Sequence, residues 1–224
     1  MFDRTNYALS DFLLFSARVY HRMFELHNAA LWPVHVVALL AGFYLFAVIL
    51  WPSPRGVRGA YGLLAVVWAF VGWSFFVERY ATINWGAAYI APLFGLQAAC
   101  FGFMALRPGV IDMTFRGGAV RALVLCVLLL SLIGYPLVAV LLGRPWQAAE
   151  VFAVAPDPTA AATLAFLAAR RGNLFVPAAI IPCIWVLVTT LTLYTLASPE
   201  FFLAPLAAAL SVMAWWIGRS QRLS

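Results

Sequence analysis

Long runs of apolar residues follow one another along almost the whole chain, and they constrain its fold more than any other feature. Only 10% of the 224 residues are charged, whereas 65% are hydrophobic. A soluble domain has about 25% charged residues with which to cover its surface. We therefore expect the outer surface to face lipid, and the length leaves room for one compact helical bundle rather than two domains.

Helices fit these runs better than barrel strands do. A helix needs about 20 apolar residues to cross a bilayer, whereas the strands of an outer-membrane barrel alternate apolar and polar residues over about 10 positions. A helix also pairs its backbone polar groups within the segment, as lipid requires. Six runs are predicted to cross, and they span about residues 29–51, 59–77, 85–106, 118–142, 174–196 and 201–217.

A seventh, shorter stretch covers residues 157–171. Asp157 suits the N-cap position and Pro158 the first helical position, so the start of a helix is well marked. About 14 residues separate this cap from Arg170, which is roughly 21 Å of helix and short for a crossing. The predicted fold is an all-α integral membrane bundle in which seven transmembrane helices, the fifth one short, are preferred over six plus a re-entrant half-helix.

The arginines set the expected orientation. All 14 basic residues are arginine, and cytoplasmic loops carry an excess of positive residues. If the short helix crosses, nine arginines and one aspartate share one side, against five arginines and seven acids on the other. If it does not cross, the arginines still divide nine to five but the acids mix. We expect a multi-pass protein of the cell inner membrane, with the N-terminus outside and the C-terminus in the cytoplasm.

The whole chain, residues 1–224, is predicted to form one transmembrane domain. Its residues 1–28 are expected to be an amphipathic interfacial segment, because Arg18, Arg22 and Glu25 interleave there with apolar side chains.

Polar residues in or beside the third run are the first candidates for a ligand site. Asn84 is placed to cap this helix, and Tyr89 and Gln97 follow an i, i+4, i+8 row with Leu93, which puts them on roughly one side. A buried glutamine must find hydrogen-bond partners, so Gln97 is expected to face the interior. The simpler interpretation of this region is an interfacial aromatic belt with a solvated hairpin.

The start of the short helix is the second candidate. Its free N–H groups and the hydroxyls of Thr159 and Thr163 would suit an anion, but an ionised Asp157 would repel one. Such a carboxylate suits a cation or a proton instead. The simpler interpretation is capping by Asp157.

Charged, amide and aromatic residues at the ends of the first crossings are candidates for a vestibule: Glu78, Arg79, Asn28 and Trp32. His35, one turn inside the first crossing, suits either a haem ligand or proton carrier, or an interhelical hydrogen bond.

Prolines fall inside most of the runs, where each tends to kink its helix. Transport proteins use broken helices around a midplane site, although proline is also common in ordinary membrane helices. The residues concerned are Pro33, Pro92, Pro136, Pro177, Pro182 and Pro205.

Several classes of function are excluded or disfavoured. The absence of lysine excludes a Schiff base, and no hydrolase, metalloprotease or phosphate-loop motif occurs. The three cysteines share no metal-type spacing, and the arginines form no stripe for nucleic acid. We expect no catalytic residue, metal or cofactor.

Several segments together resemble an uncharacterised bacterial multi-pass membrane family, a domain of unknown function whose members are sometimes labelled permeases. They are residues 15–20 (FSARVY), 83–89 (INWGAAY) and 156–159 (PDPT). Some members carry cysteine between the two prolines, where this chain has Asp157, and that difference weakens any thiol or soft-metal chemistry here. The resemblance implies the membrane architecture and no activity.

The expected function is that of a transporter or permease for a small solute or ion. One alternative is a non-catalytic membrane subunit or scaffold, and another is a membrane enzyme or cofactor-binding protein. Expected partners are the lipid bilayer, a small solute or ion, and a second copy or another membrane subunit.

Overall fold

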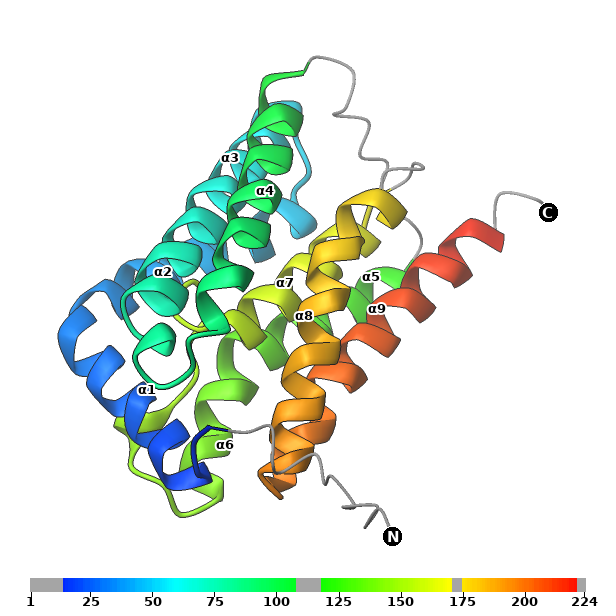
Figure 1. The fold of residues 1–224 in the computed structure, drawn as a ribbon. Coiled ribbons are helices and arrows are strands. Elements are labelled where there is room, and N and C mark those ends of the chain that lie inside the picture. Colours follow the sequence, from blue (N-terminus) through cyan, green and yellow to red (C-terminus); the bar gives the residue numbers. More distant parts are fainter. Residues whose placement is uncertain (1–13, 108–117, 171–174, 221–224) are drawn as a thin grey trace, which may run out of the picture.

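The computed structural model describes residues 14–107, 118–170 and 175–220, and within these ranges every regular element is helical (Figure 1). The α-helices are α1 (Ala17–Leu31), α2 (Val34–Leu50), α3 (Pro54–Val71), α4 (Ala87–Leu106), α5 (Gly118–Leu129), α6 (Tyr135–Leu141), α7 (Pro156–Ala168), α8 (Phe175–Thr195) and α9 (Leu203–Ser220). Two π-helical segments, η2 (Gly72–Val77) and η4 (Leu130–Gly134), continue α3 and join α5 to α6. Short 3₁₀ turns are η3 (Tyr80–Thr82), η5 (Trp146–Ala148) and η6 (Pro199–Phe202).

Five helical stretches are long and apolar enough to cross a membrane: Pro54–Thr82, Ala87–Leu106, Gly118–Leu141, Phe175–Thr195 and Pro199–Ser220. They correspond to five of the six long runs in the sequence. Their outer faces carry exposed apolar side chains, such as Leu96 (61% exposed) and Leu187 (61% exposed). The all-helical, apolar architecture predicted from composition is therefore confirmed.

The first predicted crossing, residues 29–51, is not one continuous helix. α1 extends to Leu31, and the chain bends by 94° before α2 begins at Val34, although the two helices together are apolar enough for a span. Pro33 explains the break, because proline has no N–H to donate and its ring clashes with the preceding turn. Ser16 caps α1 by accepting a hydrogen bond from the Val19 N–H (3.4 Å).

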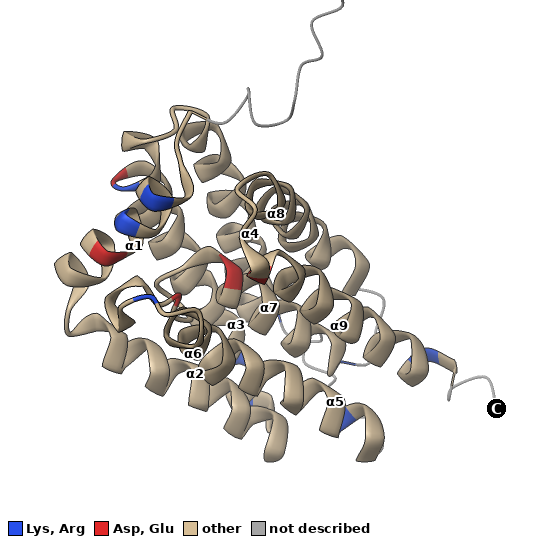
Figure 2. Cartoon of the chain, turned by 90° about the horizontal axis from the view of Figure 1, so that it is seen from below, with Lys and Arg blue, Asp and Glu red and all other residues tan. Residues whose placement is uncertain are grey.

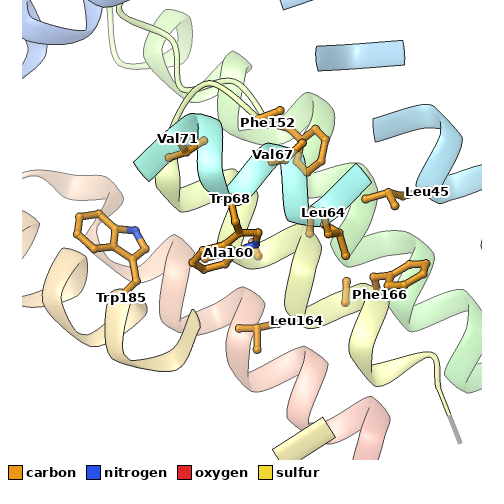
Figure 3. Packing of buried hydrophobic residues seen from close by; sticks show 14 of the residues in the cluster. Leu45, Leu64, Val67, Trp68, Val71, Phe152, Ala160, Leu164, Phe166 and Trp185 are labelled. Atoms are coloured by element: carbon orange, nitrogen blue, oxygen red, sulfur yellow. The ribbon is translucent and has the colours of Figure 1, made fainter. Parts of the chain in front are cut away.

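α7 lies at the centre of the bundle, and all 13 of its residues are buried. It packs against α5, α8 and α9, and against α3 on another side. Figure 3 shows Ala160, Leu164 and Phe166 of α7 among side chains of α3 and Trp185 of α8. Small alanines on several faces permit this close packing, and a helix that is apolar all round is one that is buried.

The chain reaches α7 through residues 142–155, which are non-helical except for η5. α1 holds this segment from one side. Asn28 Nδ2 donates hydrogen bonds to the carbonyl oxygens of Gln147 (2.6 Å) and Ala149 (2.8 Å), and His27 Nε2 lies 3.2 Å from the Val154 carbonyl oxygen. Figure 1 shows the segment leaving the end of α6 and entering the bundle, after which α7 continues towards the opposite end.

The start of α7 differs from the sequence prediction. The helix begins at Pro156 with Ala155 as its N-cap, so Asp157 lies in the first turn and does not cap. Thr159 ties down the entering chain instead: its Oγ1 accepts a hydrogen bond from the Ala153 N–H (2.9 Å) and donates one to the Ala155 carbonyl oxygen (2.7 Å). The Asp157 carboxylate is therefore left for partners on other helices.

The continuous helix formed by α3 and η2 packs closely against α4. A Cβ atom added at Gly72 would lie 3.0 Å from the Phe94 Cβ, so only glycine permits this approach without displacing α4. The rings of Trp68 and Phe94 pack with their centroids 4.5 Å apart, and those of Phe76 and Phe94 with their centroids 4.4 Å apart. This aromatic layer forms one wall of the interior around α7.

Candidate functional site: a buried carboxylate cavity

A small, partly open cavity lies beside the first turn of α7, and its volume of about 20 Å³ matches the space that one water-sized particle needs. Three acidic residues line it, and each comes from a different part of the chain. Asp157 belongs to α7, Glu150 to the segment before it, and Glu200 to the turn between α8 and α9. Arg144 and Tyr135 complete the polar lining.

The Asp157 carboxylate is held by α8. Trp185 Nε1 donates a hydrogen bond to Oδ1 (2.7 Å), and Thr189 Oγ1 donates one to Oδ2 (2.8 Å). Asp157 is only 2% exposed. Two donors aimed at its two oxygens compensate part of the loss of hydration that a buried carboxylate suffers.

Arg144 and Glu200 form an ion pair on the side of the cavity nearest the end of the bundle. Their side chains are 18% and 6% exposed. The Arg144 guanidinium also reaches α1, where its Nη1 lies 2.8 Å from His21 Nδ1. One guanidinium therefore joins the loop after α6, the turn before α9 and helix α1.

Glu150 and Tyr135 are without hydrogen-bond partners among the residues that the structure describes. Three buried atoms here make no hydrogen bond to the described residues: Glu150 Oε2, the Tyr135 hydroxyl and Glu200 Oε2. Asp157 and Glu200 line the same cavity as Glu150, and Arg144 is the basic residue in its lining. Three acids around one guanidinium thus leave an excess of acidic groups in a small buried volume.

The arrangement suits a proton or a very small cation better than a coordinated metal. In the parts of the chain that the structure describes, no three His, Cys, Asp or Glu side chains are close enough together to hold a metal ion. The cavity also has no room for an organic solute in this conformation.

The ligand-lining residues predicted from the sequence are only partly brought together. Thr159 and Thr163 are fully buried in α7 with Asp157, but Thr159 binds its own backbone, and Thr163 accepts a hydrogen bond from Trp68 Nε1 (2.9 Å). Gln97 is buried, as its polarity predicts, and its Nε2 donates to the Ala178 carbonyl oxygen (3.1 Å). These contacts join α4 to α8 and α3 to α7, away from the cavity.

Asn84 and Tyr89 lie elsewhere. Asn84 Oδ1 accepts a hydrogen bond from the Gly86 N–H (3.0 Å), which is a local turn contact. Tyr89 is 74% exposed and packs edge-on against Trp85, so it does not share the buried side of Gln97. The reason is geometric: eight residues turn a helix about 80° beyond two full turns, which is enough to carry a side chain from the interior to the surface.

The vestibule candidates separate into two groups. Asn28 is buried against residues 147–149, and its Oδ1 lies 3.0 Å from His35 Nε2, while Trp32 is exposed and stacks on the His35 ring. The pair Glu78 and Arg79 lies after η2, where Glu78 is exposed and Arg79 half-buried. His35 thus makes the contact between α2 and α1 that the simpler interpretation expected.

Sequence reasoning did not select Glu150, Glu200, Arg144 or Tyr135 as site residues. In the sequence, Arg144 and Glu200 lie at the ends of predicted crossings, where charged residues are common. The available signal was an acidic residue with apolar neighbours on both sides, as in Ala148-Ala149-Glu150-Val151-Phe152. Only the way in which residues 142–155 fold back into the bundle shows that these side chains meet.

Comparison with known proteins adds a family and no activity. A model of a family of unknown function, DUF6064, matches residues 17–222. This match confirms the resemblance to an uncharacterised family. No curated protein and no solved structure matches the chain.

Proposed function

We propose that this chain, which belongs to a family of unknown function, is a multi-pass transporter of the cell inner membrane. It moves a proton or small cation through the centre of its helical bundle. The membrane location is supported by five helical stretches of spanning length and by the apolar side chains on their outer faces. Contiguous apolar surface of that extent is otherwise rare on proteins in water.

Charge supports seven crossings, with α7 and the residues leading into it as the fifth. In Figure 1 the start of α3, the end of α4, the end of α7 and the end of α9 lie towards one end of the bundle, and these positions carry Arg55, Arg107, Arg170 and Arg219. Figure 2, seen from below the view of Figure 1, shows basic and acidic positions together around α1 and acidic positions in the middle of the bundle. On α5 and near the end of α9 it shows basic positions without acidic ones. By the positive-inside rule the arginine-rich end faces the cytoplasm.

The observation that carries the transport proposal is the start of α7 inside the bundle, where non-helical backbone meets buried carboxyl groups. Non-helical backbone at membrane depth is tolerated where protein or a cavity surrounds it, and secondary transporters place their ion sites at such broken helices. Ionisable residues within a membrane bundle are also costly, which favours a functional role for Asp157 and its neighbours.

A proteoliposome assay tests this proposal. Purified protein is reconstituted, a membrane potential is imposed, and uptake of protons, Na⁺ and K⁺ is followed with fluorescent indicators. Asp157→Asn is expected to lower the initial rate at least about tenfold, which corresponds to about 1.4 kcal/mol. Glu25→Gln is the matched control, because Glu25 pairs with Arg22 on the surface of α1. Uptake no faster than in empty vesicles for all three ions would contradict transport.

A second candidate function is that of a non-catalytic membrane subunit, and the size of the cavity favours it. A volume of about 20 Å³ offers no passage for any solute larger than water in this conformation. This function predicts that a second membrane protein co-purifies in a fixed ratio in mild detergent, whereas an autonomous transporter purifies alone and retains uptake.

A further inference from the structure

The charges around the cavity are not equally well satisfied, and the difference singles out one carboxyl group. Arg144 pairs with Glu200, and Asp157 accepts hydrogen bonds from Trp185 and Thr189. Within the described parts of the chain, Glu150 makes neither an ion pair nor a hydrogen bond, and its Oε2 is buried. Glu150 is half-buried, and an ionised carboxylate there would leave this oxygen with neither hydration nor a hydrogen-bond donor.

A second, independent feature marks the same place. Tyr135 is only 5% exposed and lines the cavity, yet its hydroxyl has no hydrogen-bond partner among the described residues. Buried hydroxyl groups nearly always have a partner. Tyr135 therefore presents a free donor and acceptor to the cavity that Glu150 also lines, and a protonated carboxyl group is a suitable neighbour for it.

We propose that Glu150 binds a proton in this cavity and that the Arg144–Glu200 pair separates this proton from the end of the bundle. The reaction is a simple protonation: the carboxylate of Glu150 accepts a proton from water, and releases it to water when the pair opens. This inference rests on the proposed transport function, because transport would give the bound proton its role. The protonation of Glu150 itself is measured without a transport assay.

The groups that face Glu150 support this assignment. They come from several elements around the cavity: Tyr20 of α1, Tyr135 of α6, Arg144 after α6, Asp157 of α7 and Glu200 of η6. His21 of α1 contacts Arg144 from outside this group. Arg144 is the cation among them, and Glu200 already pairs with it. Two neighbouring carboxylates disfavour a third negative charge, and so they favour the protonated form of Glu150.

The experiment is an infrared titration of the purified protein in lipid nanodiscs, from acidic to alkaline pH, in a buffer whose only cation is choline. The carbonyl stretch of a protonated carboxyl group reports the bound proton directly. The parent is expected to keep this band at neutral pH and to lose it at alkaline pH. Glu150→Gln is expected to remove the neutral-pH band, whereas Glu25→Gln, which changes a surface acid paired with Arg22, retains it.

Thermal stability provides a second readout on the same samples. The folded protein of this proposal holds Glu150 protonated, so ionisation of this carboxyl group at alkaline pH leaves a charge without a donor and destabilises the fold. The parent should therefore melt at a lower temperature at alkaline than at acidic pH. Glu150→Gln should show a smaller decrease, while Glu25→Gln should follow the parent.

Two outcomes would overturn the proposal. One is a parent without a carboxyl band at neutral pH, or a band that persists in Glu150→Gln. The other is a band that disappears when Na⁺ or K⁺ replaces choline at constant pH, since a metal cation would then occupy the site in preference to the proton. The infrared titration could show a titrating Glu150 while the proteoliposome assay shows no uptake. That result would contradict transport and support the proton site, so the two proposals are tested separately.

Discussion

At the scale of single residues, hydrogen bonds from α8 determine where the Asp157 carboxylate lies. Its position in the first turn of α7 would allow several orientations. Trp185 and Thr189, just over one turn apart on α8, each donate to a different carboxylate oxygen. Other threonines of α8 donate to their own helix: Thr190, Thr192 and Thr195 bond the carbonyl oxygens four residues earlier. Thr189 differs from them because its position on α8 faces Asp157, although the residue type is the same.

This difference gives a prediction with a control on the same helix. Thr189→Val keeps the shape of the side chain but removes the donor to Asp157, and is expected to lower the free energy of unfolding by about 1–2 kcal/mol, since hydrogen bonds to charged groups exceed neutral ones. Thr195→Val removes an exposed contact to the Leu191 carbonyl oxygen and should change stability little. Melting temperatures in one detergent measure both, and equal decreases would contradict the assigned role of Thr189.

At the scale of elements, the segment 142–155 and α7 depend on their surroundings for their structure. α7 has 13 residues and is buried on all sides, and the segment before it has little regular structure of its own. Helices of that length are marginal in isolation. α1 contributes the restraint, because Asn28 bonds two backbone carbonyl oxygens of the segment and His27 approaches a third.

Asn28→Leu tests this restraint. The change removes two donors and leaves the carbonyl oxygens of Gln147 and Ala149 without them, which is expected to cost about 1–3 kcal/mol of local stability. Hydrogen exchange measured by mass spectrometry should become faster in residues 146–155. Asn84→Leu serves as the control, because Asn84 bonds near its own turn, to Gly86 and Tyr80, and not to residues 146–155. Unchanged exchange in 146–155 would show that α1 does not hold the segment.

At the scale of the whole molecule, the number of crossings determines which turns face which side. If α7 and the residues before it cross, Trp146 and Pro199 share a side and Arg219 lies on the other. If they form a re-entrant segment, Trp146 and Pro199 lie on opposite sides. All three positions are exposed, so each can be labelled.

Cysteine labelling distinguishes the two topologies. In a variant whose Cys100, Cys126 and Cys183 are replaced by alanine, an impermeant maleimide is expected to label Trp146→Cys and Pro199→Cys on intact cells. Arg219→Cys should react only after permeabilisation, because the arginine-rich end is placed in the cytoplasm. Labelling of Trp146→Cys but not Pro199→Cys from outside would support six crossings.

The sequence by itself determined the features that depend on local composition. A chain with so few charges and such long apolar runs can satisfy its backbone only by forming helices, and the positions of Pro, Gly and Arg predict where most of them end. Gln97 was predicted to be buried because an amide in an apolar run must find a partner. The predicted cap at Asp157 was wrong, because an N-cap and a first-turn acid are separated by only one or two residues.

Only the tertiary structure decided which polar groups meet. Glu150, Asp157 and Glu200 are separated by 7 and 43 positions along the chain, and no periodicity relates a loop, a helix start and a turn. They come together because residues 142–155 return into the bundle and place α7 at its centre. Tyr89 reached the surface for a related reason, since which side of a helix is buried is set by the neighbours against which the helix packs. Composition acts locally and can be read from the sequence, whereas a buried site is made by contacts between distant segments.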